Sequence, residues 1–334
     1  MGPGDCGIPD NRAMSLSRPE PDPAQHLLVP FASASAPECQ AALRELALPN
    51  LSALLAALAP QPADSGDDQA FSTPHERALA RWLGLPTDDG RIPWAAAAGE
   101  QPKQPQAWFT PCHFQVGMDQ VTLLPSDQIG LIDADSRALF DALAPFCAED
   151  GIDLTYESAV RWHAQGEPLR DLICASLDRV SGRSVADWTP SQGHSPLITR
   201  LQSEAQMLFY THTVNDRREA DRAYIVNGFW IHGAGALTSL LAPVAPPTQP
   251  DALRQAALRA DWATWRAAWL VLDAGAIAQA LQRVGQGQPF TLTLCGERSA
   301  QTWAPPPSGL GPRIGRFFHL LRGAPPAWKT LETL

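Results

Sequence analysis

Apolar and polar residues alternate along most of the chain in patterns that predict helices and strands in turn. Apolar residues at positions 51, 54, 55 and 58 recur with the period of a helix. Short apolar runs at residues 26–31 and 290–295 are typical of buried strands. Further helices are predicted at residues 37–46, 74–83, 133–145, 170–180 and 197–210, and further strands at 107–116, 121–124, 154–157, 160–163 and 225–231.

This alternation predicts an α/β fold, in which a mostly parallel sheet is flanked by helices and carries a smaller inserted α/β domain. Residues 25–105 and 186–334 are predicted to form the core, and residues 106–185 the inserted domain. Residues 1–24 show no periodicity and are rich in Pro, Gly, Asp and Arg, so we expect them to be a disordered leader.

The densest group of polar side chains lies between His212 and Ala236 and leads into the apolar strand predicted at residues 225–231. That strand is followed by Gly233-Ala-Gly235, where a turn is expected. Backbone N–H groups at such a turn and nearby guanidinium groups suit an anion. A solvated loop before a core strand explains the same pattern equally well. Under the binding hypothesis the ligand-binding residues are His212, Asn215, Arg217, Arg218, Asn227, Trp230, Gly233 and Gly235.

Other polar residues of the chain have ordinary explanations beside functional ones. Arg161 and His163 share one face of a predicted strand and could reach a ligand, although such a pair more often faces water. His75 lies in the first turn of a predicted helix, where capping is the simpler role. Asp178 and Arg179 lie near the end of another predicted helix, where a structural role is expected.

Net charge and composition narrow the classes of partner. Hydrophobic residues make up 45% of the 334 residues, which is enough for a core, and the formal net charge is −10. This charge argues against nucleic acid or an anionic membrane as a partner. The chain has no apolar run long enough to span a bilayer and no secretory signal, so a cytoplasmic location is expected. Six widely spaced cysteines without a C-x-x-C pair are expected to be free thiols.

Three segments carry a resemblance to a known family: residues 48–55 (LPNLSALL), residues 108–114 (WFTPCHF) and residues 214–235. The last and most specific holds Val214-Asn215, Arg217, Val226-Asn227, Trp230 and Gly233-Ala-Gly235. Together they resemble the archaeal-type cofactor-independent phosphoglycerate mutases of the alkaline phosphatase superfamily. As a whole the sequence looks closer still to a bacterial offshoot, the regulatory proteins of RpfE type. The resemblance implies an alkaline-phosphatase-like core.

The chain departs from this family where the family binds two divalent metals. The family's first strand ends in Asp-Gly, whereas the matching strand here ends in Pro30-Phe31. A later family strand supplies an Asp-His pair, whereas residues 294–297 read LCGE. Two adjacent metals need several converging carboxylate and imidazole groups. We therefore expect no metal, no cofactor and no catalytic residue, and predict a regulatory or ligand-binding pseudo-enzyme whose partner is a small anionic metabolite.

Two other functions remain open from the sequence. One is a metal-dependent phosphoryl-transfer enzyme, a phosphoglycerate mutase or phosphatase, with Mn or Zn held by unrecognised ligands; the candidates are His113, Asp119, His232 and Asp273. Residue 273 ends either a strand or a helix in this interpretation. The other function is docking on a macromolecule, with a protein as the possible partner. It would use the basic tail at residues 313–322 and a stripe of tryptophans, Trp262, Trp265 and Trp269. At helical spacing such a stripe is more often packed in a core.

Overall fold

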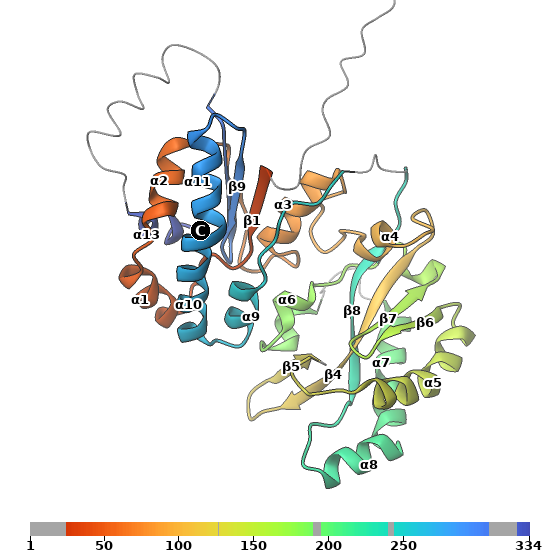
Figure 1. Cartoon of the computed structure of the whole chain (residues 1–334). Helices are drawn as coiled ribbons and strands as arrows, with labels where there is room; N and C mark the ends of the chain where they lie inside the picture. The colour runs from red at the N-terminus through yellow and green to blue at the C-terminus, as the bar shows by residue number, and fades with distance from the viewer. Residues whose placement is uncertain (1–24, 126, 190–194, 240–243, 307–325) are drawn as a thin grey trace, which may run out of the picture.

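The chain folds into two lobes, each built on its own sheet (Figure 1). The computed structural model describes residues 25–125, 127–189, 195–239, 244–306 and 326–334. The leader predicted at residues 1–24 and the basic tail at residues 313–322 lie outside these residues. No helix in the described ranges combines the length and apolar character needed to cross a membrane.

The sheet of the first lobe has the order β1-β9-β10-β2, with β3 also paired to β10. Among the strands of this sheet in the described residues, only β1 (His26–Val29) and β9 (Thr291–Cys295) run parallel. β10 (Ser299–Ala304) pairs antiparallel with β9, β2 (Ala59–Pro60) and β3 (Asp64–Ser65). The prediction of a mostly parallel sheet is therefore wrong. A short connection from β9 to β10 allows only an antiparallel pair, since a parallel pair needs a long crossover.

Helices cover both faces of this sheet. On one face, Leu27, Val29 and Leu292 pack against a helical layer that also contains Trp265 and Trp269. On the other face, Leu28 belongs to a smaller hydrophobic cluster and packs against α3 (Pro74–Leu83). The helices of the larger layer are α1 (Pro37–Glu45), α2 (Pro49–Ala57), α9 (Ala252–Leu258), α10 (Trp262–Leu272), α11 (Ala278–Gly285) and α13 (Ala327–Leu331).

The second sheet is antiparallel throughout and has the order β5-β4-β7-β6, with β8 on the other edge of β4. The sequence placed residues 228–235 with the first unit. They form β8 (Gly228–Gly235) and pair with β4, so this segment belongs to the second sheet. The other strands are β4 (Gln106–Val116), β5 (Val121–Pro125), β6 (Asp153–Ser158) and β7 (Arg161–Gln165).

The two faces of β4 and β8 differ in what they contact. Phe109 and Phe229 stack with their ring centroids 4.6 Å apart and belong to the core beneath the helices of this lobe. Because side chains alternate along a strand, Trp108, Thr110 and His232 point to the opposite face. The helices of the covered face are α5 (Asp133–Glu149), α7 (Pro196–Tyr210) and α8 (Thr213–Ala220).

Two short helices lie where the lobes meet: α4 (Trp94–Ala98) and α6 (Leu177–Val180). A helix was predicted over residues 170–180, but only α6 forms, so that prediction is wrong for the first part. There the backbone bonds to other segments instead: the N–H of Cys174 donates to Gly90 O, and that of Ser176 to Phe71 O. These long-range bonds replace the helical ones.

Candidate functional site

The polar residues that stand out in the sequence at 215–227 bond mainly to the backbone of their own lobe. The Asn215 amide donates to Phe209 O and Val226 O and accepts from Val226 N, at 2.7–2.9 Å. Asn227 accepts from Phe114 N at 2.6 Å and donates to Phe114 O at 3.0 Å. Both amides therefore extend the backbone hydrogen bonding beside β4 and β8.

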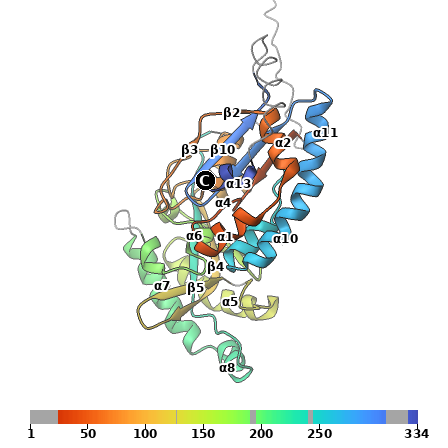
Figure 2. The same cartoon turned by 90° about the vertical axis from the view of Figure 1, so that its left-hand side faces the viewer.

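Arg217 and Arg218 lie on α8, where a loop was one of the two expectations. Arg218 is 6% exposed and donates to Tyr224 O, Ile129 O and Gly130 O, and its Nη1 lies 3.5 Å from Asp135 Oδ2. Arg217 is exposed and also pairs with Asp135. We call Asn215, Arg217, Arg218 and Asn227 the α8 cluster. Figures 1 and 2 show α8 at the end of the second lobe that lies away from the first.

The remaining residues of the predicted ligand site are spread along α8 and β8. His212 caps α8, with Nδ1 accepting from Val214 N at 3.2 Å. The indole of Trp230 donates to Ala175 O at 3.0 Å. Gly233 and Gly235 have φ of 64° and 134°, but they lie inside β8 rather than in a turn after it. The expected turn is therefore wrong, and ligand binding by this set stays a prediction.

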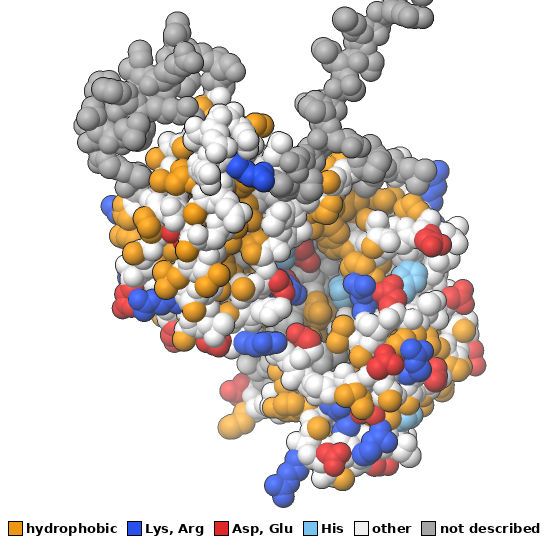
Figure 3. All heavy atoms as spheres, viewed as in Figure 1, with side chains coloured by type: hydrophobic (Ala, Val, Ile, Leu, Met, Phe, Trp, Pro, Cys, Tyr) orange, Lys and Arg blue, Asp and Glu red, His pale blue; other side chains and the backbone are white. Residues whose placement is uncertain are grey.

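A cleft between the lobes brings together polar side chains from distant segments of the chain. Figure 3 shows the molecule hollowed here. Two cavities, of about 380 and 420 Å³, share Leu177, His232 and Arg254 among their lining residues. Each volume lies within the range of small-molecule sites.

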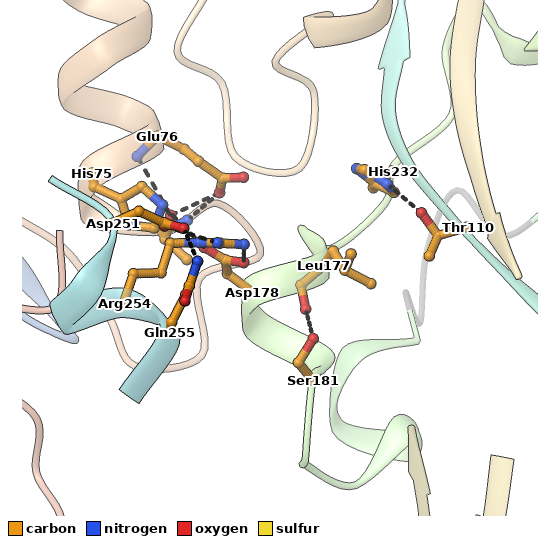
Figure 4. A network of polar contacts seen from close by, with 11 residues as sticks. His75, Glu76, Thr110, Leu177, Asp178, Ser181, His232, Asp251, Arg254 and Gln255 are labelled. Carbon is orange, nitrogen blue, oxygen red and sulfur yellow. Dashed lines mark hydrogen bonds and ion pairs between the residues drawn. The ribbon is translucent and has the colours of Figure 1, made fainter. Parts of the chain in front are cut away.

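An ion-pair network joins the lobes along this cleft (Figure 4). Arg254, from α9, donates through Nε and Nη2 to the two oxygens of Asp178 at 2.6 and 2.5 Å. Its Nη1 bonds to Asp251 at 3.1 Å. His75 Nε2 lies 3.2 Å from Asp178 Oδ2. We call these four residues, His75, Asp178, Asp251 and Arg254, the cleft network.

Local structure positions two members of this network. A capping box fixes the first turn of α3, where Thr73 accepts from Glu76 N and the Glu76 side chain accepts from Thr73 N. This cap places His75 at the start of α3. Asp178 lies on α6, which the long-range backbone bonds of residues 174 and 176 hold against the first lobe.

Charge pairing decides the protonation of the network. Burial alone would raise the pKa of Asp178, but hydrogen bonds from His75 and Arg254 outweigh it and hold that pKa well below its usual range. Burial likewise opposes the charge of Arg254, yet its bonds to Asp178 raise the pKa of the guanidinium. Both groups are therefore charged at neutral pH, as bidentate Arg–carboxylate geometry requires.

The second lobe contributes His232, Thr110 and Trp108 to the cleft. His232 Nε2 lies 3.0 Å from Thr110 Oγ1. Desolvation lowers the pKa of His232 to about 4, so its ring is neutral at pH 7. The guanidinium carbon of Arg161 lies 4.8 Å above the centre of the Trp108 ring, and Arg161 Nε bonds to Glu157 at 2.6 Å. The cleft thus offers an aromatic wall beside a cation and a neutral imidazole.

The two cavities differ in charge. The cavity near α3 is lined by the carboxylates of Glu76, Asp178 and Asp251. The other holds the guanidinium groups of Arg161 and Arg254 with a single carboxylate, that of Asp127. It also holds the hydroxyls of Thr110, Ser158 and Ser181. This second cavity, which we call the basic cavity, suits an anion with further hydrogen-bonding groups.

The residues proposed as metal ligands do not come together. Asp273 lies in the first lobe, in the π-helical turn Asp273–Ile277 that continues α10 into α11, so it ends neither a strand nor a helix. It is buried and accepts from Leu51 N at 2.7 Å. His113 bonds to Ile225 O in the second lobe, and Asp119 is exposed beyond the end of β4. Only His232 lies in the cleft. Across the described ranges, no three His, Cys, Asp or Glu side chains are grouped to hold a metal.

The tryptophan stripe belongs to the core of the first lobe. Trp265 and Trp269 are fully buried, and the Trp265 indole donates to Phe31 O at 2.9 Å. Trp262 packs edge-on against Trp265. The packing explanation is therefore confirmed for the two buried rings, and docking through them would require exposure that they lack. The five described cysteines, Cys39, Cys112, Cys147, Cys174 and Cys295, are free thiols, as expected.

Sequence reasoning missed the cleft network. His75 and Asp178 were expected in local structural roles, and Arg254 was not singled out. Asp178 and Arg254 are 76 positions apart, and no motif joins them. Two signals were available in the sequence. The spacing of Arg161 from His163 put it on a face that could reach a ligand, His232 was among the candidate metal ligands, and both line the basic cavity. His163 bonds to Gln106 Oε1 at 2.8 Å instead.

Comparison with known proteins shows only distant structural likeness. The chain is similar to the cofactor-independent phosphoglycerate mutase from Thermoplasma acidophilum DSM 1728, at 12% identity and a TM-score of 0.37, over 86% of this chain and 90% of the mutase. It is also similar to the PH0037 protein from Pyrococcus horikoshii, at 10% identity and a TM-score of 0.42, over 84% and 86% of the two chains. No family model and no curated protein matches the sequence.

Proposed function

We propose that this protein binds a small anionic metabolite in the basic cavity and acts as a regulatory protein. The observation that carries the proposal is a cavity of about 420 Å³ in which Arg161 from one lobe and Arg254 from the other approach the same space. We also propose that the protein is a phosphoglycerate-mutase-like regulatory protein of RpfE type that works without metal or cofactor. In this proposal the ligand binds in the cleft and not at the α8 cluster.

Arg161 is the residue expected to contact the ligand most directly. Its Nε donates to Glu157, and its guanidinium stacks on the Trp108 ring. These contacts hold the side chain at the cavity and leave the guanidinium half-exposed, so a ligand can reach it. Arg254, by contrast, directs Nε and Nη2 to Asp178 and so links the lobes. A ligand that contacts both arginines would draw the two lobes together, so ligand binding should shorten the distance between the lobes.

The ligand is expected to combine negative charge with hydroxyl or carbonyl groups. The hydroxyls of Thr110, Ser158 and Ser181 line the cavity. Ser181 Oγ already donates to Leu177 O at 2.6 Å and can only accept from a ligand, and Thr110 Oγ1 shares a hydrogen bond with His232 Nε2 at 3.0 Å. Sugar phosphates, phosphorylated hydroxy acids and hydroxycarboxylates have this chemistry. Val160, Leu177 and Leu258 line the same cavity and suit the carbon skeleton of such a molecule.

The test is a thermal-shift panel of 3-phosphoglycerate, fructose 6-phosphate and citrate, followed by calorimetry on any anion that raises the melting temperature. Arg161→Gln should raise the Kd about tenfold or more, because it removes a charged hydrogen-bond donor. Arg137→Gln is the matched control. Arg137 also stacks on an aromatic ring, that of Tyr156 at 3.9 Å, and also pairs with a carboxylate four residues before it.

The control variant should leave the Kd within about twofold, since Arg137 lies on α5 away from the cavity. The proposal fails if none of the three anions binds. It also fails if Arg161→Gln binds the ligand as tightly as the wild type.

A further inference from the structure

Arg179 is a buried arginine whose charge has no carboxylate partner among the described residues. Its side chain is 2% exposed, and only Nη1 makes a hydrogen bond, to Glu297 O at 3.0 Å. Nε and Nη2 are buried without a partner in the described part of the chain. A buried guanidinium left unpaired is costly, so this arrangement calls for an explanation.

The unpartnered atoms are concentrated around this residue. Six buried side-chain polar atoms of the described residues lack a partner, and four of them belong to Ser176, Arg179 and Trp188. The Arg179 guanidinium carbon lies 5.6 Å from the Trp188 ring centre. Ser176 precedes Arg179 by one turn, and its carbonyl accepts from Arg179 N at 3.1 Å. A hydroxyl, an indole N–H and two guanidinium nitrogens are thus left over in one segment.

Arg254 shows what the free edge of Arg179 is shaped to hold. Arg254 uses Nε and Nη2, the same two atoms, to bind both oxygens of Asp178 (Figure 4). These two N–H groups form one side of a planar fork that matches a carboxylate or phosphate bidentately. In Arg179 the same edge meets no oxygen of the described residues.

The carboxylates that act on Arg179 electrostatically are those of Glu297, Glu76 and Asp67, and none of them forms an ion pair with it in the described residues. Glu297 pairs with Arg183 and accepts from Ser35 Oγ at 2.5 Å, and the Glu76 side chain accepts from Thr73 N. Burial, followed by the charges of Arg183 and Arg77, lowers the pKa of Arg179 to about 10. Arg179 therefore stays charged at neutral pH, and water alone would bond to it without neutralising it.

We propose that Arg179, with Ser176 and Trp188, forms an internal site for a small oxyanion, a carboxylate or phosphate group held by the Nε–Nη2 edge. This site is separate from the basic cavity, which Arg179 does not line. The anion would neutralise the buried cation and tie α6 to the first lobe through Glu297. Because Asp178 also lies on α6, a bound anion would stabilise the position of Asp178 in the cleft network.

The experiment refolds the full chain from urea in sodium chloride and in phosphate, sulfate or acetate of equal ionic strength, and then measures thermal unfolding. The wild type should melt about 2 to 4 °C higher in at least one oxyanion than in chloride. Phosphate and sulfate also raise the melting temperature of any fold slightly because they are excluded from its surface. Arg179→Met should keep only that general rise and lose the rest, because the variant has no charge to neutralise. Arg161→Gln should keep the rise, which separates this site from the proposed cleft ligand.

A second variant covers the case in which Arg179→Met does not fold. Trp188→Phe keeps an aromatic ring and removes the indole N–H. The Kd for the oxyanion, read from the melting temperature as a function of oxyanion concentration, should rise roughly threefold to tenfold. The proposal is overturned if wild-type protein melts at one temperature in all four salts. It is also overturned if Arg179→Met gains as much from the oxyanion as the wild type, or if Trp188→Phe leaves the Kd unchanged.

Discussion

The α8 cluster and the cleft network each hold an arginine that pairs with a carboxylate, yet they are built in opposite ways. Asn215, Arg218 and Asn227 lie close in sequence and bond chiefly to backbone groups within one lobe. Asp178 and Arg254 are 76 positions apart and bond side chain to side chain across the two lobes. A dense polar run in a sequence can therefore complete a fold, while a binding cleft gathers residues that the sequence scatters.

The largest effect is expected in the α8 cluster. Arg218→Met should lower the free energy of unfolding by about 3–5 kcal/mol, because Asp135 loses its buried partner and three carbonyls lose a donor. Arg217→Met is the control and should cost less than about 1 kcal/mol, since Arg217 is exposed. Urea unfolding of both variants measures the difference. Equal small losses would mean that the cluster does not support the fold.

A slightly smaller loss is expected from the cleft network. Asp178→Asn should cost about 2–4 kcal/mol at pH 7, because Arg254 and His75 lose their shared carboxylate. The pKa of Asp178 is depressed in the fold, so its contribution is present above the unfolded pKa of about 4 and is lost as pH falls below it. The gap between wild type and variant should therefore narrow in acid. A gap that stays constant from pH 7 to pH 3 would contradict this.

His232 should make the cleft sensitive to pH in a higher range. Its folded pKa of about 4 lies below the usual 6.5, so the unfolded chain takes up the proton first as pH falls. Wild-type stability should drop by roughly 1–3 kcal/mol more than that of His232→Gln between pH 7 and pH 4. Unfolding curves at intermediate pH values check this. Parallel curves for the two proteins would show that His232 is not held neutral.

The smallest effect on stability is expected for Arg161, the residue proposed to contact the ligand most directly. Arg161→Gln and its control Arg137→Gln should each change the free energy of unfolding by less than about 1 kcal/mol, because both guanidinium groups are half-exposed. The same urea series measures them. A large loss in Arg161→Gln alone would give Arg161 a structural role and weaken its assignment to the ligand.

Local elements could be predicted from the sequence because they depend on neighbouring residues. The helix predicted at residues 74–83 is confirmed, and the strand predicted at residues 26–31 forms over His26–Val29. The sheet that β8 joins could not be predicted, because strand pairing depends on β4, about 120 positions earlier. The helix predicted at residues 170–180 was wrong because backbone bonds to Gly90 and Phe71 outweigh local propensity.

The candidate site could be predicted only in part, for the same reason. The alternation of side chains along a strand predicted which face Arg161 occupies, because that depends only on neighbouring residues. The pairing of Asp178 with Arg254 depends on how the two lobes pack together, and no pattern in the sequence predicts this packing. Arg179 gave no signal either, since a buried arginine without a carboxylate reads in the sequence like any arginine near a helix end.

Calorimetric titration of the best anion from the panel into wild type, Arg161→Gln and Arg217→Gln tests most directly whether the cleft rather than the α8 cluster binds the ligand. Both arginines are substantially exposed, so both variants should fold. The cleft account predicts a Kd about tenfold higher or more in Arg161→Gln and an unchanged Kd in Arg217→Gln. The reverse pattern would contradict it and return the site to the α8 cluster.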